Sequence, residues 1–562
     1  MNTVVFSKDI PDATLRGKLS EALKAKGLFP HYTTCLPLDI TAACPRALIA
    51  LDATGFEFMQ QARRSCPNAT CSAIVVHHNA ELADLIDGAY TFMLAHKLAV
   101  LGAYSESRFV VLTGEKGIAP SASLAPFFKD FASILSSRSA KHHFKTELKT
   151  VVDFELAPGC VEQMLKTTRE WASLGCFSAY EEKDATLYAE AQFGFVARRT
   201  PRGTLITTRA SNKSALSAGD LALIRDVNAR NVVSAESFSG KKPSLNGVLA
   251  HRIFSLRPQI QWVVHLHAFM PNGVNAPVIS APGTLEDWLS IEKLVAKGER
   301  LINQPLHGSL ILLEKPEELL TVLKAQNLYH AQSELYELAY ARFQSADAKS
   351  PFEVAIRELG LPVLSETLDL CCGTGASTRM LKQLFSKVDF ADGSDAMLSV
   401  AEKTLGGKGL KCTLPHLADL NAKRYDLIVM RQAFNYVSPK DRSSFFAAVR
   451  RGLNKGGWLV FNTFEPLPDG ALTERNGKLE GQSTLVRTEE HNIVRGETIT
   501  HGQRTELIDT VRGTWQTLFD VNSFYQHDIE RIKQTLGACG FRTQVRHQGK
   551  SIVFLAQTDA IT

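Results

Sequence analysis

Residues 367–375 read TLDLCCGTG, and this stretch decides how the C-terminal third of the chain is interpreted. Its apolar residues predict a buried β-strand that ends in a Gly-x-Gly turn at Gly373 and Gly375. Residues 376–385 follow with apolar residues at helical spacing, so a helix is expected directly after the turn. Glycine allows a ligand to approach the backbone, and the first N–H groups of a helix are open to it. The stretch therefore predicts either a ligand-binding loop or a plain strand–helix turn.

Further segments downstream repeat the strand pattern in a fixed order. They are VDFADGSDAML (388–398), ADL (418–420), RYDLIVM (424–430), LNKGGWLV (453–460) and a closing pair of strands at 541–547 and 551–556. With the Gly-x-Gly turn, they resemble the motifs of class I S-adenosylmethionine-dependent methyltransferases. The resemblance covers residues 351–562 and implies a Rossmann-like sheet that binds S-adenosyl-L-methionine and methylates a small molecule. A dinucleotide would favour G-x-G-x-x-G, whereas the third glycine position here is Thr378.

The resemblance also implies which residues hold the cofactor. Asp392, with Asp395 as the alternative, ends the second strand and is expected to bind the ribose hydroxyls. Asp419 is expected near the adenine amino group. The remaining expected cofactor-binding residues are Asp369, Cys371, Gly373, Gly375 and Arg431.

The methyl acceptor is expected past the fourth strand. Methyl transfer from a sulfonium mainly needs positioning, and a base if the nucleophile carries a proton. Gln432, Asn435 and Tyr436 follow that strand and are the catalytic candidates, with ordinary loop residues as the alternative. Strand-like alternation over residues 483–524 predicts an insertion that either covers the acceptor site or extends the sheet. His491 and His501 within it are candidate bases or solvated strand histidines.

A second candidate site lies in the middle of the chain. Residues 261–268 read QWVVHLHA, and the period of two in a strand points His265 and His267 to one face. His307 precedes Gly308 at the start of a later apolar strand. Three histidines with an open position form a zinc site of the catalytic type, whereas the alternative is satisfied core or surface histidines.

The histidines and several upstream segments resemble class II aldolase/adducin domains. The upstream segments are residues 193–198, 203–208, 242–244 and 256–258. Over residues 153–343 the resemblance implies an α/β/α domain, three histidine ligands for a divalent metal, expected to be zinc, and a homo-oligomer. Asn246 stands where the family has its catalytic acid, and an amide cannot take a proton as a carboxylate does. Arg209 is a candidate to hold a substrate carboxylate.

Strand and helix patterns alternate in residues 1–148, which predicts a doubly wound parallel sheet. Strands are expected at 3–7, 47–52, 71–77 and 108–113, and helices at 13–26, 80–104 and 121–135. The layout faintly resembles a short-chain-dehydrogenase-like Rossmann unit. No glycine-rich loop follows the first strand, so we interpret this domain as a degenerate, non-catalytic docking unit.

The amino-acid composition limits the class of protein, its partners and its location. The chain has 562 residues with 44% hydrophobic and 22% charged residues, which is ordinary for a globular protein. A net charge of +5 (63 − 58) does not indicate nucleic-acid or membrane partners. The ten cysteines form no CxxC pair, and no segment resembles a signal peptide or a membrane span, so a cytoplasmic location is expected. Three α/β domains result: 1–148, 149–344 and 351–562, with a polar linker at 344–351.

The functional prediction is an S-adenosylmethionine-dependent methyltransferase for a small molecule. The metal domain would add a lyase, decarboxylase or enolising step on the same substrate. Two alternatives stay open: the metal-dependent lyase is the main activity, or the first two domains serve only docking and oligomerisation.

Overall fold

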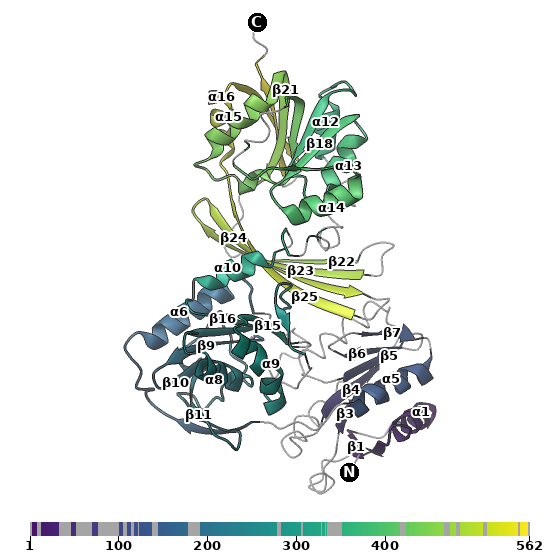
Figure 1. Ribbon diagram of the computed structural model, residues 1–562, viewed down its shortest axis with the longest axis vertical. Helices are drawn as coiled ribbons and strands as arrows, with labels where there is room; N and C mark the ends of the chain where they lie inside the picture. Colours follow the sequence, from purple (N-terminus) through teal and green to yellow (C-terminus); the bar gives the residue numbers. More distant parts are fainter. Residues whose placement is uncertain are drawn as a thin grey trace.

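In the computed structural model of the chain, the described residues form four β-sheets (Figure 1). The structure describes residues 3–7, 13–32, 47–51, 70–76, 100–104, 109–113, 117–121, 123–137, 144–177, 192–277, 283–304, 307–327, 329–331, 333, 336, 351–415, 417, 423–465, 472–478, 484–509, 514–548 and 551–559. We call the sheets N-terminal, central, C-terminal and inserted. In Figure 1 the N-terminal and central sheets lie at the bottom, the C-terminal sheet at the top, and the inserted sheet between them.

The N-terminal sheet has the strand order β2-β1-β3-β4-β5-β6-β7. Its strands are β1 (Thr3–Phe6), β2 (Phe29–Tyr32), β3 (Ala47–Leu51), β4 (Thr70–Val76), β5 (Val100–Tyr104), β6 (Phe109–Thr113) and β7 (Gly117–Ser121). The first five in this order are parallel, β6 runs antiparallel to β5, and β7 runs antiparallel to β6 and so in the direction of the first five. Helices α1 (Ala13–Lys24) and α5 (Leu124–Ser137) share one apolar core with β1 and β3.

The strands and the first and last helices expected in residues 1–148 are confirmed, with two corrections. The helix expected over 80–104 is wrong at its end, because residues 100–104 form β5; residues 80–99 lie outside the described part. Leu101 and Ala103 are fully buried, and a short apolar run in a central strand cannot be told from a helix by its period. The expected all-parallel sheet is also wrong at β6, which runs antiparallel to both of its neighbours, β5 and β7. The order 2-1-3-4-5 differs from the 3-2-1-4-5-6 order of dinucleotide-binding sheets.

The central sheet has nine strands in the order β14-β15-β16-β13-β9-β10-β11-β12-β8. They are β8 (Lys145–Thr150), β9 (Phe195–Thr200), β10 (Gly203–Thr207), β11 (Leu221–Val227), β12 (Val232–Ser237), β13 (Trp262–Leu266), β14 (Val274–Asn275), β15 (Leu301–Gln304) and β16 (Gly308–Leu313). Helices α8 (Gly247–Leu256) and α9 (Leu285–Lys297) cover one face. Helices α6 (Cys160–Ala172) and α10 (Glu318–Ala325) cover the other. The expected α/β/α layering is present.

The C-terminal sheet has the order β19-β18-β17-β20-β21-β27-β26, and β27 alone among these strands runs antiparallel to the others. The strands are β17 (Glu366–Leu370), β18 (Lys387–Asp392), β19 (Leu410–Lys411), β20 (Tyr425–Met430), β21 (Leu453–Phe464), β26 (Phe541–Gln548) and β27 (Ser551–Thr558). Two helix pairs pack on opposite faces: α12 (Pro351–Arg357) with α13 (Ala376–Lys382), and α15 (Arg442–Gly452) with α16 (Ile529–Ala538). Helix α14 (Asp395–Leu405) follows β18. The strands expected here from sequence are confirmed.

The inserted sheet consists of β22 (Leu472–Lys478), β23 (Thr484–Arg495), β24 (Thr498–Asp509) and β25 (Thr514–Tyr525). It lies in sequence between β21 and α16 but forms a sheet of its own, so the alternative that it extends the main sheet is wrong. One face packs on the central sheet, where Phe519 and Val521 are buried in the same core as α6 and α10. Arg504 also donates to the backbone oxygens of Gly175 (3.1 Å) and Cys176 (3.3 Å).

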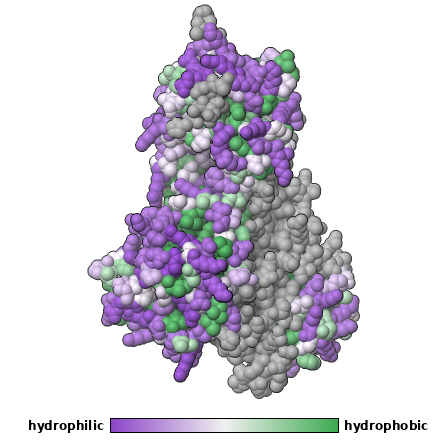
Figure 2. Space-filling model, in the orientation of Figure 1, coloured by the Kyte–Doolittle hydropathy of each residue, from purple (hydrophilic) through white to green (hydrophobic). Residues whose placement is uncertain are grey.

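Among the described residues, no helix is both long and apolar enough to cross a bilayer. Figure 2 shows one face of the molecule, and most described residues on it are hydrophilic.

Candidate functional site

The loop after β17 has an unusual backbone. Cys371 (φ 63°), Gly373 (φ 57°) and Gly375 (φ 93°) all lie in the left-handed region. A Cβ at Gly375 would strain this positive-φ backbone and lie 2.7 Å from a methyl carbon of Leu405 in α14, which would have to move, so glycine is favoured here. Cys371 is not glycine, and its backbone is strained by about 1 kcal/mol or more, which is the kind of strain that gathers at functional sites. Burial raises the pKa of the Cys371 and Cys372 thiols, so both are neutral.

Asp392 lies at the end of β18 and faces this loop. Its Oδ2 accepts a hydrogen bond from the Gly373 N–H (2.9 Å), and its Oδ1 accepts from the Ser394 N–H (2.8 Å). Burial raises the pKa of this carboxyl above its ordinary value. Asp395 instead is exposed and pairs with Lys411 (2.6 Å). The geometry therefore favours Asp392 over Asp395 as the acid beside the glycine loop.

Asp369 is fully buried inside β17. Its Oδ2 accepts from the hydroxyls of Ser377 (2.7 Å) and Thr378 (2.6 Å), which ties the first turn of α13 to the strand. Burial raises the pKa of Asp369 to about 6, and the charge of Arg431, which follows β20, opposes that rise. The expected roles of Asp369 and Arg431 at a cofactor stay predictions. Asp419 lies outside the described residues.

The three catalytic candidates after β20 lie beside β21 and β25. Gln432 has a positive φ of 53°, and its N–H donates to Asn462 Oδ1 (2.6 Å). Asn435 is buried in the 3₁₀ turn η5 (Phe434–Tyr436), where its amide donates to the Tyr525 backbone oxygen (2.8 Å). Its Oδ1 accepts from the Thr463 hydroxyl (3.2 Å). Asn435 thus joins the turn to both strands, while the side chain of Gln432 is exposed.

Tyr436 contacts a segment that the sequence analysis assigned to the middle domain. Its hydroxyl lies 3.1 Å from the Tyr329 hydroxyl, and the Ser394 hydroxyl donates to the Tyr329 backbone oxygen. Withdrawal from water raises the pKa of Tyr436, and the hydroxyl lies within electrostatic reach of Cys371. Tyr329 therefore belongs to this site, although it lies before the linker expected at 344–351. Residues 344–350 are outside the described part.

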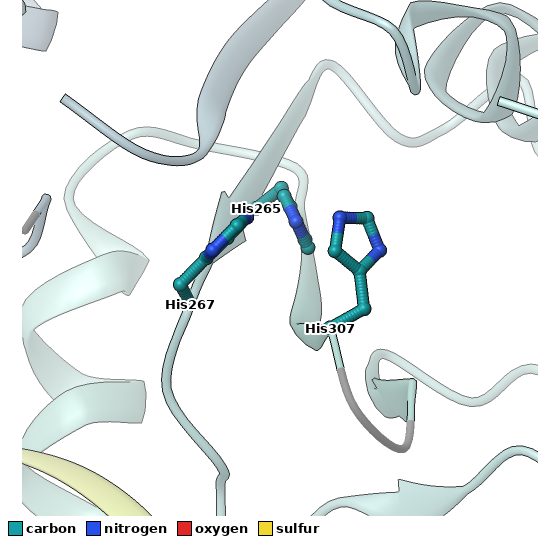
Figure 3. Close-up of side chains that lie close together, drawn as sticks. All are labelled: His265, His267 and His307. Atoms are coloured by element: carbon teal, nitrogen blue, oxygen red, sulfur yellow. The ribbon is translucent and has the colours of Figure 1, made fainter. Parts of the chain in front are cut away.

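The three histidines of the central sheet come together (Figure 3). One nitrogen from each of His265, His267 and His307 lies within 4.8 Å of the others. His265 is near the end of β13, His267 follows it, and His307 directly precedes the neighbouring strand β16. A Cβ at Gly308 would lie 1.9 Å from the Leu266 oxygen, so glycine lets His307 approach β13. Tetrahedral zinc needs nitrogens about 3.4 Å apart, so small ring rotations would suffice.

Partners around the cluster orient it for a metal. His265 Nδ1 lies 3.0 Å from the Ser309 carbonyl oxygen. A carbonyl only accepts, so Nδ1 carries the hydrogen and Nε2 has the lone pair that a metal requires. Asn246 Nδ2 lies 3.2 Å from His307 Nδ1, which places this candidate directly beside the cluster. Arg209 donates from Nε to the Pro243 oxygen (3.1 Å), and its expected carboxylate contact stays a prediction.

Comparisons with known proteins address the C-terminal part. Residues 367–457 match the family model described as "Methyltransferase domain". This part of the chain is therefore similar to a methyltransferase domain, and we call residues 351–562 the methyltransferase domain below. The chain is also 25% identical over 160 residues to the carboxy-S-adenosyl-L-methionine synthase of Shewanella baltica. That match covers 25% of this chain and 66% of the relative, just under two thirds of its length.

Two solved structures are similar to part of the chain. Streptomyces venezuelae DesVI has a TM-score of 0.35 and 17% identity, covering 40% of this chain and 98% of that chain. An S-adenosylmethionine-dependent methyltransferase from Clostridium acetobutylicum has a TM-score of 0.34 and 19% identity, covering 40% of this chain and 98% of that chain.

Strand β25 separates the histidine cluster from the methyltransferase domain. Near its start, the Thr517 oxygen accepts from the Phe269 N–H (2.8 Å), two residues after His267. At its end, the Tyr525 oxygen accepts from Asn435. The eight residue steps between them span about 26 Å of strand. A small molecule therefore cannot contact both sites at once.

Sequence reasoning placed two of the expected groups correctly in space: the loop with Asp392, and the three histidines with Asn246. It missed Tyr329 and the buried polar residues of the inserted sheet. A signal for these polar residues was available in the sequence of β23. Every second residue of a strand faces the same side, and on β23 these positions include Thr488, Glu490 and Asn492.

Proposed function

We propose that the methyltransferase domain binds S-adenosyl-L-methionine and transfers its methyl group to a small-molecule acceptor. The main observation in support of this proposal is the strained loop after β17, whose Gly373 N–H donates a hydrogen bond to Asp392. A carboxylate at the end of the second strand beside a glycine loop is the arrangement that binds ribose hydroxyls in related folds. The curated relatives are named for making a carboxylated form of the same cofactor, which supports the cofactor class.

The residues of this domain would act mainly by position. S-adenosyl-L-methionine supplies an activated methyl group on a sulfonium, and the protein must hold an acceptor in line with it. The Tyr436 hydroxyl lies within electrostatic reach of Cys371, so the end of the loop is near the turn after β20. The neutral Cys371 thiol and the protonated Tyr436 hydroxyl offer no strong base there. A proton on the acceptor would have to leave to another group.

Asp392 and Asp395 provide a matched pair for the test. The two acids lie three residues apart, but only Asp392 faces the loop. Calorimetric titration of the full chain with S-adenosyl-L-methionine is expected to show a loss of about 10-fold to 100-fold in affinity for Asp392→Ala, the value of a charged hydrogen bond. Asp395→Ala should bind as the wild type does. Equal affinities for both variants would refute the assignment.

A second function is favoured by the histidine cluster. We propose that His265, His267 and His307 hold a divalent metal, with zinc as the first choice because all three ligands are imidazoles. The hydrogen bond from His265 Nδ1 to Ser309 fits this, since it presents Nε2. A metal there would polarise a carbonyl or carboxylate of a substrate, which suits a lyase, decarboxylase or enolising step. For His307 to bind the metal through Nε2, Asn246 would have to turn its Oδ1 toward His307 Nδ1, because the amide nitrogen that lies there now can only donate.

Metal analysis tests this second proposal. Purified His265→Ala is expected to contain much less zinc than the wild type. His251→Ala is the control, because His251 lies on α8 of the same unit and contacts Thr204 rather than the cluster. Equal zinc contents in wild type and His265→Ala would show that the ligands are wrongly assigned.

A further inference from the structure

The three histidines of the cluster are fixed by different parts of the fold. His265 lies inside β13, which pairs with β9 on one side and with β16 on the other. His267 follows β13 directly, and His307 directly precedes β16, so His307 lies outside the ladder of paired strand residues. The position of His307 therefore depends on the connection from β15 to β16.

One backbone hydrogen bond closes this connection. The His307 N–H donates to the Gln304 oxygen (3.0 Å). Strand β15 ends at Gln304, and Gln304 lies opposite Gly308 as the last residue pair of the two strands. A shift of Gln304 is thus passed directly to His307.

The side chain of Gln304 is anchored to a buried carboxylate. Its Nε2 donates to Asp287 Oδ1 (2.7 Å), and Gln304 is 4% exposed and Asp287 1%. A carboxylate oxygen only accepts, so the amide nitrogen has to face Asp287. Hydrogen bonds to a charged group are roughly twice as strong as those between neutral groups. The pair therefore ties the first turn of α9 to the end of β15.

Helix α9 does not need this carboxylate to begin. Thr284 is its N-cap, and Thr284 Oγ1 accepts from the Asp287 N–H (3.2 Å). Burying a carboxylate costs free energy even when it is paired, whereas an apolar side chain packs without that cost. Trp288 and Ile291 of the same helix pack in this way. A buried Asp287–Gln304 pair next to His307 is therefore better explained by a need for fixed orientation.

The preceding residue of β15 has a matching place beside His267. Asn303 is fully buried, its Oδ1 accepts from the Met270 N–H (3.0 Å), and its Nδ2 donates to the Met270 oxygen (2.8 Å). Met270 lies three residues after His267. Successive strand residues face opposite sides, so Asn303 and Gln304 fix the surroundings of two different histidines from one strand end.

We propose that Asp287 and Gln304 are positioning residues for His307 in the metal site. The proposal rests on the proposed metal binding and deepens it. Outer partners that orient a metal ligand typically contribute about 10-fold to 100-fold to metal affinity. This pair acts through the backbone of His307, while Asn246 contacts its ring. Removing the pair should lower metal affinity although all three histidines remain.

The zinc affinity of the metal-free full chain, measured by competition with a chelator, tests this proposal. Asp287→Ala and Gln304→Leu are each expected to raise the Kd for zinc by about 10-fold or more. The double variant should bind no more weakly than the weaker single variant, because both changes remove the same hydrogen bond. Asp287→Asn should regain most of the affinity, since its amide oxygen can accept from Gln304. Cobalt(II) in place of zinc should show a changed visible spectrum in Asp287→Ala.

Glu292→Gln is the control. It also removes a carboxylate from α9, but Glu292 lies within electrostatic reach of Arg252 on α8, so wild-type affinity is expected. If Asp287→Ala and Gln304→Leu lower only the Tm of the metal-free chain and leave the zinc Kd and the cobalt spectrum unchanged, the role is structural and the proposal is overturned. Zinc binding by Asp287→Asn as weak as by Asp287→Ala would also overturn it. A wild-type chain that binds no zinc would instead refute the proposed metal site itself.

Discussion

Substituting Gly502 by alanine tests whether the inserted sheet is packed on the central sheet. Gly502 lies on β24 and faces residue Leu174, just after α6. A Cβ there would lie 1.8 Å from the Leu174 backbone oxygen and 2.9 Å from its carbonyl carbon. A backbone oxygen cannot rotate aside as a side chain can, so the two sheets must separate locally.

The expected cost follows from this geometry. Forcing an extra methyl group into a packed contact costs about 1–3 kcal/mol, and the rigid partner places Gly502→Ala near the upper end. For a cooperative unit of about 150–250 residues, 1 kcal/mol shifts Tm by about 2–4 °C, so a fall of about 6–12 °C is expected.

Differential scanning calorimetry of the full chain measures this shift. Gly537→Ala is the matched control, because Gly537 lies in α16 and a Cβ there would meet nothing within 4 Å. Alanine there should raise stability by up to about 1 kcal/mol, since it is the better helix former. An unchanged Tm for Gly502→Ala, or a shift like that of Gly537→Ala, would contradict the close packing of β24 against Leu174.

Three further predictions follow from particular contacts. Burial raises the pKa of Asp369 to about 6, whereas the same carboxyl in the unfolded chain loses its proton near pH 4. The folded protein therefore binds the proton more tightly, and the stability that Asp369 contributes is lost as the pH rises from about 4 to 6. Asp369→Asn should flatten that slope in urea denaturation at several pH values, and an unchanged slope would contradict the assignment. Gly308→Ala should lower zinc content, because its Cβ would press on the Leu266 oxygen beside His267; full zinc by elemental analysis would count against the cluster. A fragment of residues 346–562 should aggregate, because Phe519 and Val521 would lose the apolar residues that cover them in the full chain. Light scattering measures this. A monodisperse fragment that folds cooperatively would show that the contact between the inserted sheet and the central unit is dispensable.

Local patterns predicted most of the strands and both candidate sites. The Gly-x-Gly turn and the His-x-His strand are short-range signals, because a turn or a strand period decides where their side chains point. Residues 100–104 were misread as helix, since a short apolar run fits either structure. The antiparallel direction of β6 depends on pairing between strands, which no local pattern encodes.

Contacts between distant segments were the part that sequence could not supply. Tyr329 and Tyr436 are 107 residues apart, and their hydrogen bond depends on how the central and C-terminal sheets dock. The placement of Glu490 and Asp520 on one side of the inserted sheet likewise depends on the register of three strands. The pairing of the inserted strands into a sheet of their own, which rules out the alternative that they extend the main sheet, also depends on contacts beyond the local pattern.

A crystal structure of the full chain with S-adenosyl-L-homocysteine is the decisive measurement for the methyltransferase domain. We expect one cofactor molecule against the loop of residues 371–375, with its ribose hydroxyls on Asp392 and its sulfur toward Tyr436. A cofactor bound to another sheet, or one whose ribose lies away from Asp392, would contradict the proposed function.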